Sequence, residues 1–360
     1  MAFEPTSAIS EQDGNTVRLY AAPRWVRPDG ALWRPIQSLI TPLGSGYDVL
    51  GPRGVASFRP AKRPVGGLSA AVIEGQQFGD EIILANVETS IQYTVTPPPG
   101  AVETENGWSL GQWDGVEIGL FFDDWAERFG ERFSRRGTLL SLDLSVEKEA
   151  VAEDPAATLS LDPSIAVASY ALHVMYTGIW ATVRDYATSS SSSGSVIAVQ
   201  GTKAGPLYYI NRSCLRFDTS AYNPLTAYLF INTANTGTDV YLARSLNGFA
   251  TPLTTNTNYA EVKTSYGDAG SQVGAMVSAG GSWYKSADLV AANRWAATST
   301  YDLCLAEYAY DVLNPGAPTG ANSVTISTGA NQPYLLLALP FVGHHAVGRG
   351  VGNGVHMGIG

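Results

Sequence analysis

Charged side chains are scarce in this chain. Only 15% of the 360 residues are Asp, Glu, Lys or Arg, against about 25% in an ordinary soluble domain. Hydrophobic residues make up 45%, so a sizeable core can form, and there are 38 Gly and 20 Pro. Few charges, many turn formers and many aromatic residues favour an all-β protein. They argue against a helical bundle or a βαβ enzyme.

Basic residues are especially few, and the charge is unevenly distributed. Residues 1–165 contain 13 Lys and Arg against 23 Asp and Glu, whereas residues 166–360 contain 9 of each and are neutral. An acidic chain lacks the basic surface that binds nucleic acid, so we expect no nucleic-acid partner. A neutral, sparsely charged surface is poorly protected against association. We therefore expect a permanent assembly with other copies of the chain and with other proteins.

The chain has only two cysteines, Cys214 and Cys304, which excludes a disulfide framework. Each lies in a strand-like run, SCLRF or DLCLAEY. The simplest interpretation is a pair of small buried hydrophobic residues. A single disulfide between them requires that the two strands are neighbours.

Neither a leader nor a membrane span is expected. The first residues, MAFEPTSAISEQ, contain no basic segment followed by an apolar one, so we expect no signal peptide. The longest apolar run, YLLLALPFV at 334–342, is too short to cross a bilayer and contains Pro340. The protein is thus expected to be made in a cytoplasm, although its composition is that of a protein that works at a surface. A virion component combines the two, because it is assembled inside a cell and used outside it.

Residues for catalysis or metal binding are also sparse. The four histidines are His173, His344, His345 and His356, and three of them lie in a Gly-rich tail. Neighbouring His344 and His345 do not suit a four-ligand metal site, so we predict no metal and no cofactor. Only His173 could serve a catalytic triad, and no nucleophile-elbow motif accompanies it. Adjacent carboxylates point to different faces of a strand or helix and do not form an acid–base pair. We therefore predict no enzyme.

The amino-terminal part, residues 1–146, is predicted to be a β-rich domain with one amphipathic helix at 123–136. Phe122, Trp125, Phe129 and Phe133 recur at helical spacing and are predicted to face the core. A basic block at 15–63 precedes an acidic block at 64–124. The two blocks could be sheets of one domain that meet by charge, or faces that bind neighbouring subunits. Residues 147–165 are interpreted as a linker.

Residues 166–342 are predicted to form a jelly-roll-like antiparallel β-sandwich. About eight short strands recur there, separated by polar turns. The central stretch at 208–229, YYINRSCLRFDTSAYNPLTAYL, predicts two strands joined by a short connection, because Ser213, Leu215 and Phe217 alternate with Cys214 and Arg216.

This stretch resembles the signature of DNRLRE-type jelly-roll modules, an Arg followed by a strand that ends in Phe-Asp-Thr-Ser. RSCLRFDTSAYN carries the resemblance, and Asp185-Tyr186, DLCL at 302–305, GAPTG at 316–320 and PYL at 333–335 extend it. Roughly residues 166–342 are covered. Such modules occur in phage and prophage structural proteins and in large secreted bacterial proteins, where they are linked to carbohydrate contact or to scaffolding. The resemblance implies no enzymatic activity.

We therefore expect a non-enzymatic virion structural protein of a bacteriophage: a head decoration, fibre or tail-associated component. The tail, residues 343–360, is too rich in glycine to build a core and is expected to become ordered only against a neighbour. Its candidate contact residues are Gly343, His344, His345, Arg349 and His356.

The alternative is a carbohydrate-binding module that recognises a host surface glycan. Sugars stack on aromatic faces, although aromatic residues more often lie in cores or interfaces. The candidate contacts are Trp283, Tyr284 and Trp295, with Tyr308 and Tyr310 as further aromatic residues nearby.

Overall fold

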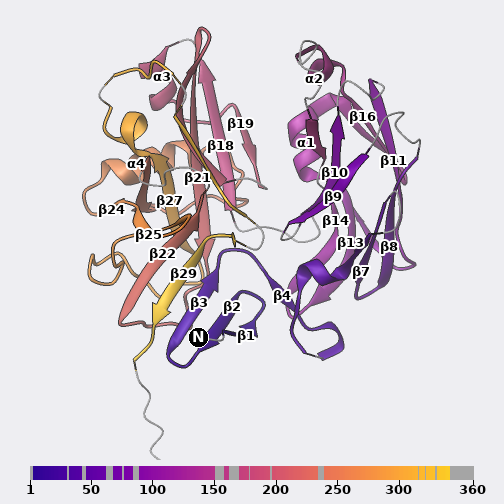
Figure 1. Cartoon of the computed structure of the whole chain (residues 1–360), viewed down its shortest axis with the longest axis horizontal. Coiled ribbons are helices and arrows are strands. Elements are labelled where there is room, and N and C mark those ends of the chain that lie inside the picture. Colours follow the sequence, from indigo (N-terminus) through magenta and orange to yellow (C-terminus); the bar gives the residue numbers. More distant parts are fainter. Residues whose placement is uncertain are drawn as a thin grey trace, which may run out of the picture.

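The structure is a computed structural model that describes residues 3–30, 32–42, 46–61, 68–74, 77–83, 89–150, 158–161, 170–177, 179–194, 197–233, 239–314, 316–320, 322–328 and 331–340. The protein is mainly β, as the composition predicts, with several antiparallel sheets and a few short helices (Figure 1). Two β-rich bodies each have their own hydrophobic core. One body is a sandwich, and the other comprises most of the amino-terminal part.

A seven-stranded sheet forms one layer of the sandwich. Its strands in spatial order are β1 (Glu4–Ser7), β2 (Ser10–Asp13), β3 (Thr16–Tyr20), β29 (Tyr334–Ala338), β22 (Thr226–Asn232), β26 (Trp283–Lys285) and β25 (Val277–Gly280). Every neighbouring pair is antiparallel.

An eight-stranded sheet forms the second layer. Six strands lie in the order β19 (Ser191–Ser193), β18 (Tyr170–Thr177), β21 (Leu207–Phe217), β27 (Tyr301–Glu307), β23 (Val240–Arg244) and β24 (Gln272–Ala275). Strand β20 (Ile197–Ala204) pairs with both β21 and β28 (Ser323–Ile326). A bridge between Thr233 and Ile326 connects the two layers at this side.

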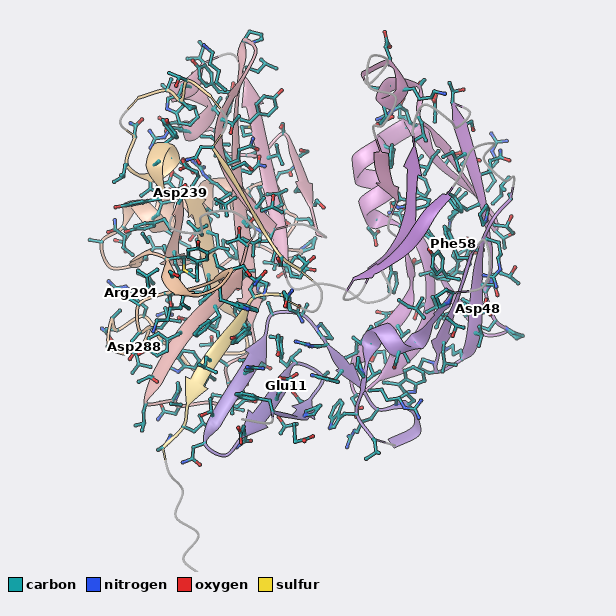
Figure 2. All side chains as sticks on the ribbon, in the orientation of Figure 1. Glu11, Asp48, Phe58, Asp239, Asp288 and Arg294 are labelled. Atoms are coloured by element: carbon teal, nitrogen blue, oxygen red, sulfur yellow. The ribbon has the colours of Figure 1, made fainter. Side chains whose placement is uncertain are left out.

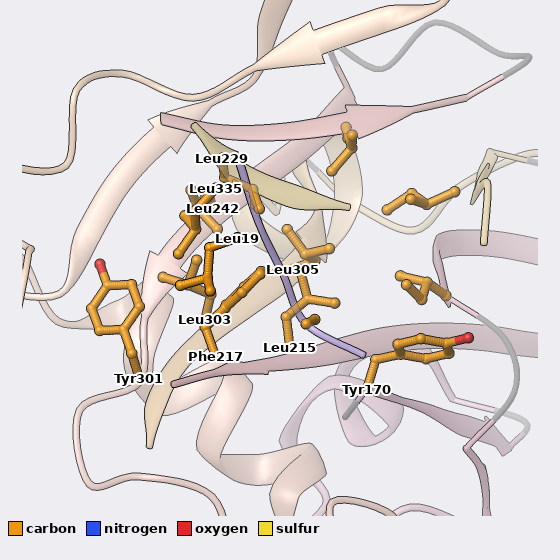
Figure 3. Packing of buried hydrophobic residues seen from close by; sticks show 14 of the residues in the cluster. Leu19, Tyr170, Leu215, Phe217, Leu229, Leu242, Tyr301, Leu303, Leu305 and Leu335 are labelled. Carbon is orange, nitrogen blue, oxygen red and sulfur yellow. The ribbon is translucent and has the colours of Figure 1, made fainter. Parts of the chain in front are cut away.

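The sandwich core lies between these sheets. Leu19, Leu229 and Leu335 come from the seven-stranded sheet and pack with Leu215, Leu303 and Leu305 of the eight-stranded sheet (Figure 3). All six side chains are fully buried. Burying one such side chain contributes about 1.5–3 kcal/mol relative to its exposure, so this layer is a main source of stability.

The first strands belong to the sandwich and not to the amino-terminal domain. Strand β3 pairs with β29 along its whole length, from Tyr20 opposite Tyr334 to Thr16 opposite Ala338. Val17 and Leu19 point into the sandwich core. The predicted domain of residues 1–146 is therefore wrong at its start. The alternation of TVRLY predicts the strand correctly, but local sequence does not specify a partner more than 300 residues away.

Three helices cover the far side of the eight-stranded sheet. They are α3 (Trp180–Asp185), α4 (Asn258–Gly267) and the π-helix η6 (Tyr308–Val312). Their buried side chains pack against residues such as Cys214 and Ile210 on that face of β21. The eight-stranded sheet is therefore covered on both faces.

The amino-terminal body contains the remaining elements. A six-stranded sheet has the order β15 (Phe133–Arg136), β16 (Leu139–Asp143), β11 (Ser90–Thr96), β8 (Gly54–Pro60), β7 (Tyr47–Gly51) and β6 (Ile40–Pro42). Smaller sheets are formed by β12 (Val102–Thr104), β13 (Gly107–Trp113) and β14 (Val116–Phe121); by β17 (Thr158–Leu161), β10 (Gln77–Ile83) and β9 (Leu68–Glu74); and by β4 (Trp25–Val26) and β5 (Arg34–Pro35). The helices are α1 (Asp123–Phe129), α2 (Ser145–Ala150) and the 3-10 turns η1 (Pro28–Gly30), η2 (Ile36–Leu39) and η4 (Gly130–Arg132).

The helix predicted at 123–136 is shorter in the structure. It ends at Phe129, because Gly130 has a positive φ of 54° that ends the helical geometry. Residues 133–136 then form β15, which pairs with β16. The prediction that the aromatic stripe is core is nevertheless confirmed, since Phe122, Trp125 and Phe129 are buried.

The predicted linker, residues 147–165, also contains regular structure. Helix α2 extends to Ala150, and β17 pairs with β10 of the amino-terminal body. This segment is therefore partly built into that body. The tail predicted at 343–360 lies outside the described residues.

The basic and acidic blocks of the amino-terminal part contact each other in at least one place. Arg27 of the basic block forms an ion pair of 2.9 Å with Asp114 of the acidic block. Other acidic residues pair differently, since Asp48 contacts Arg59 within the basic block and Glu103 contacts Arg135. Of the two interpretations left open, the Arg27–Asp114 contact favours pairing within one subunit.

Candidate functional site

Strand alternation places a group of large side chains on the outward face of the seven-stranded sheet. In β22, Leu229 points into the core, whereas Tyr228 and Phe230 are partly exposed. In β29, Leu335 and Leu337 point inward, whereas Tyr334 and Leu336 are partly exposed. Successive side chains of a strand point to opposite faces. Both faces of these two strands are therefore apolar.

The outward rings lie against one another in a row across three strands. Phe230 and Tyr334 are directly opposite in the sheet, and their rings are parallel with centroids 5.2 Å apart. Trp283 meets Tyr334 at 5.4 Å and 64°, and Tyr20 approaches it from the other side at 5.8 Å. We call the set formed by Tyr228, Phe230, Trp283, Tyr334 and Leu336 the aromatic face. The faces of its central rings are largely occupied by neighbouring rings.

Charged groups border the aromatic face on β2 and β3. The Arg18 guanidinium lies 3.9 Å from the ring centroid of Phe3 and 3.7 Å from an oxygen of Glu11. The Tyr20 hydroxyl donates to Glu11 at 3.1 Å and accepts a hydrogen bond from Arg24. Burial raises the pKa of Tyr20 to about 12. Figure 2 labels Glu11, whose side chain is almost fully buried here. Glu11 therefore offsets one of the two cations, and the Arg18 guanidinium also lies 5.4 Å from the ring centroid of Tyr334.

The structure separates the three aromatic residues that were predicted for glycan contact. Trp283 belongs to the aromatic face, but Tyr284 and Trp295 pack against the core between the two sheets. The Trp295 ring lies 5.2 Å from that of Tyr301. These residues do not form one platform. Gly343, His344, His345, Arg349 and His356, the predicted tail contacts, lie outside the described residues.

Tyr308 and Tyr310 are likewise absent from the aromatic face. Tyr308 stacks on Tyr241 with centroids 5.3 Å apart, and Tyr310 packs near the helices on the far side of the eight-stranded sheet. Sequence reasoning missed Tyr228, Phe230 and Tyr334 instead. The signal was present as alternating aromatic residues in AYLFIN and PYLLLA, but both alternating sets are apolar, so the pattern did not say which set faces outward.

A buried ion pair connects β21 to the helices. The Arg212 guanidinium donates to both oxygens of Asp311 at 2.7 and 2.8 Å, and neither side chain is exposed. Tyr266 donates its hydroxyl to Asp311 at 2.7 Å, and Arg212 also donates to the backbone oxygen of Tyr259. Burial alone would lower the pKa of Arg212, but the charge of Asp311 outweighs it and holds that pKa well above its ordinary value. The pair positions η6 and α4 on the sheet.

Glu307 acts as a backbone anchor. Its carboxylate accepts hydrogen bonds from the backbone N–H groups of Ala309, Tyr310 and Asp311 and from the side chain of Asn322. Burial raises the pKa of Glu307, and these hydrogen bonds oppose that shift. The carboxylate therefore starts the π-helix that carries Asp311. Its contacts are those of a structural group.

His173, the one triad candidate, is held by the backbone. Its Nε2 lies 3.0 Å from the carbonyl oxygen of Leu253, and its Nδ1 lies 3.4 Å from the Ser189 hydroxyl. Ser189 itself donates to Asn256 at 2.8 Å. Burial lowers the pKa of His173 to about 4, and the positive charge of Arg212 adds to that effect. The two ring nitrogens face a hydroxyl and a backbone carbonyl, so the arrangement differs from a Ser-His-Asp triad.

A shallow depression of about 360 Å³ lies beside this histidine. Its lining consists mostly of hydroxyl and amide groups from Ser190, Ser191, Ser192, Pro252, Thr254, Thr255 and Asn256. Several of these hydroxyls already donate to backbone carbonyls, such as Ser190 to Val174 and Ser192 to Thr254. The serine run at 189–193 contributes strand β19 here.

Within the described ranges, no group of three or more His, Cys, Asp or Glu side chains is arranged to hold a metal ion. In that same part of the chain, no helix is long and apolar enough to cross a membrane.

Comparison with known proteins adds no assignment: no family model matches the chain, and no curated protein matches it.

Proposed function

We propose that this chain is a non-enzymatic structural protein of a bacteriophage particle: a head decoration, fibre or tail-associated component. It acts through protein–protein assembly, and the aromatic face is its contact surface. The resemblance of residues 166–342 to jelly-roll modules of phage structural proteins supports the class of protein. The aromatic face supports the mode of action.

The observation that carries this proposal is the contiguous apolar surface on the outward face of the sheet. Tyr228, Phe230, Trp283, Tyr334 and Leu336 are all partly exposed and lie on three adjacent strands. Removing apolar surface from water is favourable by roughly 25 cal/mol per Å². Aromatic residues in well-packed central positions are typical of the residues that dominate binding energy in interfaces. The face therefore has the composition of an interface core.

A second copy of the chain is the partner that the charge distribution favours. Residues 166–360, which supply most strands of the sandwich, carry equal numbers of acidic and basic residues, so this part of the chain adds no net charge that would repel a second copy. A two-fold contact places the same patch of each copy against its counterpart. An apolar patch can be self-complementary in this way without pairing like charges.

Carbohydrate binding is the alternative. A sugar ring stacks on an exposed aromatic face, and Trp283 supplies part of one. However, Phe230 and Tyr334 cover each other, and Tyr284 and Trp295 pack against the core. A glycan array separates the two proposals, because reproducible binding that is lost on Trp283→Ala supports the alternative.

Light scattering on the full chain over a concentration series tests the assembly proposal. Phe230→Glu places a charge in the middle of the aromatic face and should convert the oligomer to a monomer. The matched control is Leu246→Glu, which changes another exposed apolar residue between β23 and α4. Circular dichroism should show that both variants remain folded.

A wild-type chain that is monomeric throughout the series would refute self-assembly through this face. Equal loss of assembly in both variants would also contradict it, since the effect would not be specific to the aromatic face. Mass spectrometry of purified phage particles tests the virion assignment, which fails if the chain is absent from them.

A further inference from the structure

The two cysteines lie directly opposite each other in the eight-stranded sheet. Cys214 of β21 faces Cys304 of β27, in an antiparallel register without irregularity. Both are free and buried. A disulfide requires neighbouring strands, and these two strands are neighbours. The two cysteines are directly paired across them.

The hydrogen bonds of β27 show which type of pair this is. The backbone N–H of Ser245, which directly follows β23, donates to the carbonyl of Asp302 in β27. These two residues are therefore a hydrogen-bonded pair. Alternate residues of a strand direct their N–H and C=O groups to the same side. Cys304 lies two residues after Asp302, so its backbone groups also point toward β23 and away from β21. Cys214 and Cys304 are therefore a non-hydrogen-bonded pair. Such pairs have Cα atoms about 4.5 Å apart, within the roughly 4.4–6.8 Å that a disulfide spans.

The surroundings leave room for the two sulfur atoms to approach. Ala171 lies opposite Cys214 on its other side, and Ala243 lies opposite Cys304. The row across four strands is thus Ala, Cys, Cys, Ala, and all four side chains belong to one buried cluster. Small flanking side chains allow the thiols to adjust without displacing bulky neighbours.

We propose that Cys214 and Cys304 are an oxidative modification site that forms an intramolecular disulfide. The oxidant is a small-molecule disulfide such as oxidised glutathione. One cysteine thiolate attacks it, forms a mixed disulfide and releases one glutathione thiol. The second cysteine thiolate then attacks the protein sulfur and releases the second glutathione thiol. Two protein thiols are oxidised, one small disulfide is reduced, and the two protons appear on the released thiols.

Burial makes the reaction slow in the fully folded protein. It raises the pKa of both thiols, so little thiolate is present. Residues of α4, including Val262 and Tyr266, pack in the same cluster and restrict access. Oxidation therefore proceeds during folding or through local opening of this helix. The cross-link rests on the geometry alone and does not depend on the proposed function.

The disulfide would join the two central strands of the sheet. It would close a loop of about 90 residues, from 214 to 304, that contains β22 to β26. Cross-linking a long loop stabilises a fold chiefly by restricting the unfolded chain. We expect the melting temperature of the sandwich to rise by about 5–10 °C on oxidation.

The test is to refold the full chain from urea with a mixture of reduced and oxidised glutathione. After denaturation and alkylation with a maleimide, intact mass should show the loss of two hydrogens and no alkylation. A peptide map should then contain a cross-linked pair carrying Cys214 and Cys304. The Cys304→Ser variant is the matched control, and it should carry only one alkylated thiol or one glutathione adduct.

Two results would overturn the proposal. One is full alkylation of both cysteines after refolding under conditions that oxidise a reference dithiol. The other is two glutathione adducts on one chain, because opposed thiols should resolve the first mixed disulfide before a second forms. A redox-dependent melting temperature in wild type that persists in Cys304→Ser would assign the stabilisation to another cause.

Discussion

Protonation of His173 should destabilise the sandwich as the pH falls from 7 to 5. The side chain is fully buried, and its imidazole lies against the Leu253 carbonyl and close to the Ser189 hydroxyl. Its pKa is lowered from 6.5 to about 4, first by burial and then by the charge of Arg212. The folded protein therefore keeps this imidazole neutral at pH values where the unfolded chain protonates it.

The sign and size of the effect follow from proton linkage. Between pH 6.5 and pH 4 the unfolded state binds the proton more strongly, so stability falls as the pH falls. The loss is complete below about pH 4 and nearly absent above pH 7. A shift of this size corresponds to about 3 kcal/mol in total, of which about 2 kcal/mol is lost between pH 7 and pH 5.

Urea unfolding followed by tryptophan fluorescence at pH 7, 6 and 5 measures this loss. His173→Gln is the comparison, because its amide can still donate to the Leu253 carbonyl and does not titrate. The other three histidines and the buried Glu307 are present in both proteins, so their contributions cancel in the difference. Wild type should lose about 2 kcal/mol more than His173→Gln over this range. Equal slopes in the two proteins would refute the assignment to His173.

Two further predictions concern the buried ion pair and the tail. Arg212→Met removes the guanidinium that binds both oxygens of buried Asp311 and leaves Arg184, 3.7 Å away, as a weaker partner, so it should cost about 3 kcal/mol of unfolding free energy. Arg212→Met combined with Asp311→Leu should recover part of that loss. Chemical denaturation measures both, and a loss below about 1 kcal/mol in the single variant would contradict the anchoring role. A chain that ends at residue 342 should keep the circular dichroism spectrum of the full chain but assemble more weakly by light scattering; unchanged assembly would remove the tail from the interface.

Local sequence patterns predicted many strands of this fold but not their partners. The alternation of TVRLY and the long run through Cys214 both correspond to strands in the structure. The pairing of β3 with β29 joins residues from opposite ends of the chain. Alternation fixes which residues share a face, but it carries no information about which distant strand lies alongside.

The end of the first helix was missed for a different reason. Phe133 continues the helical spacing of Phe122, Trp125 and Phe129, so the pattern favoured a helix that runs to residue 136. Tertiary packing decided otherwise: β15 pairs with β16, and Phe133 still reaches the same core from a strand. A spacing of four residues can arise from a helix or from a helix followed by a strand.

The role of Arg212 was equally hidden. In RSCLRF, Arg212 shares one set of alternating positions with Cys214 and Arg216, and a set with two Arg is expected to face outward in a half-buried strand. The opposite holds, because the face of β21 that carries Arg212 is covered by α3, α4 and η6. The partner, Asp311, follows 99 positions later, and only the fold brings it to the guanidinium.

The low surface charge of the sandwich and its proposed assembly role have a common physical basis. Many of its acidic side chains are used inside the fold: Asp302 pairs with Arg216, Asp311 pairs with Arg212, and Glu307 binds backbone N–H groups. Glu261 similarly accepts hydrogen bonds from Ser245 and Asn247. An ion that an interface buries loses its hydration, and this costs free energy unless a partner compensates it. A sandwich that satisfies these carboxylates internally leaves few anions to be buried when its aromatic face is covered. The cations at that face, Arg18 and Lys285, lie over the rings of Tyr334 and Tyr228.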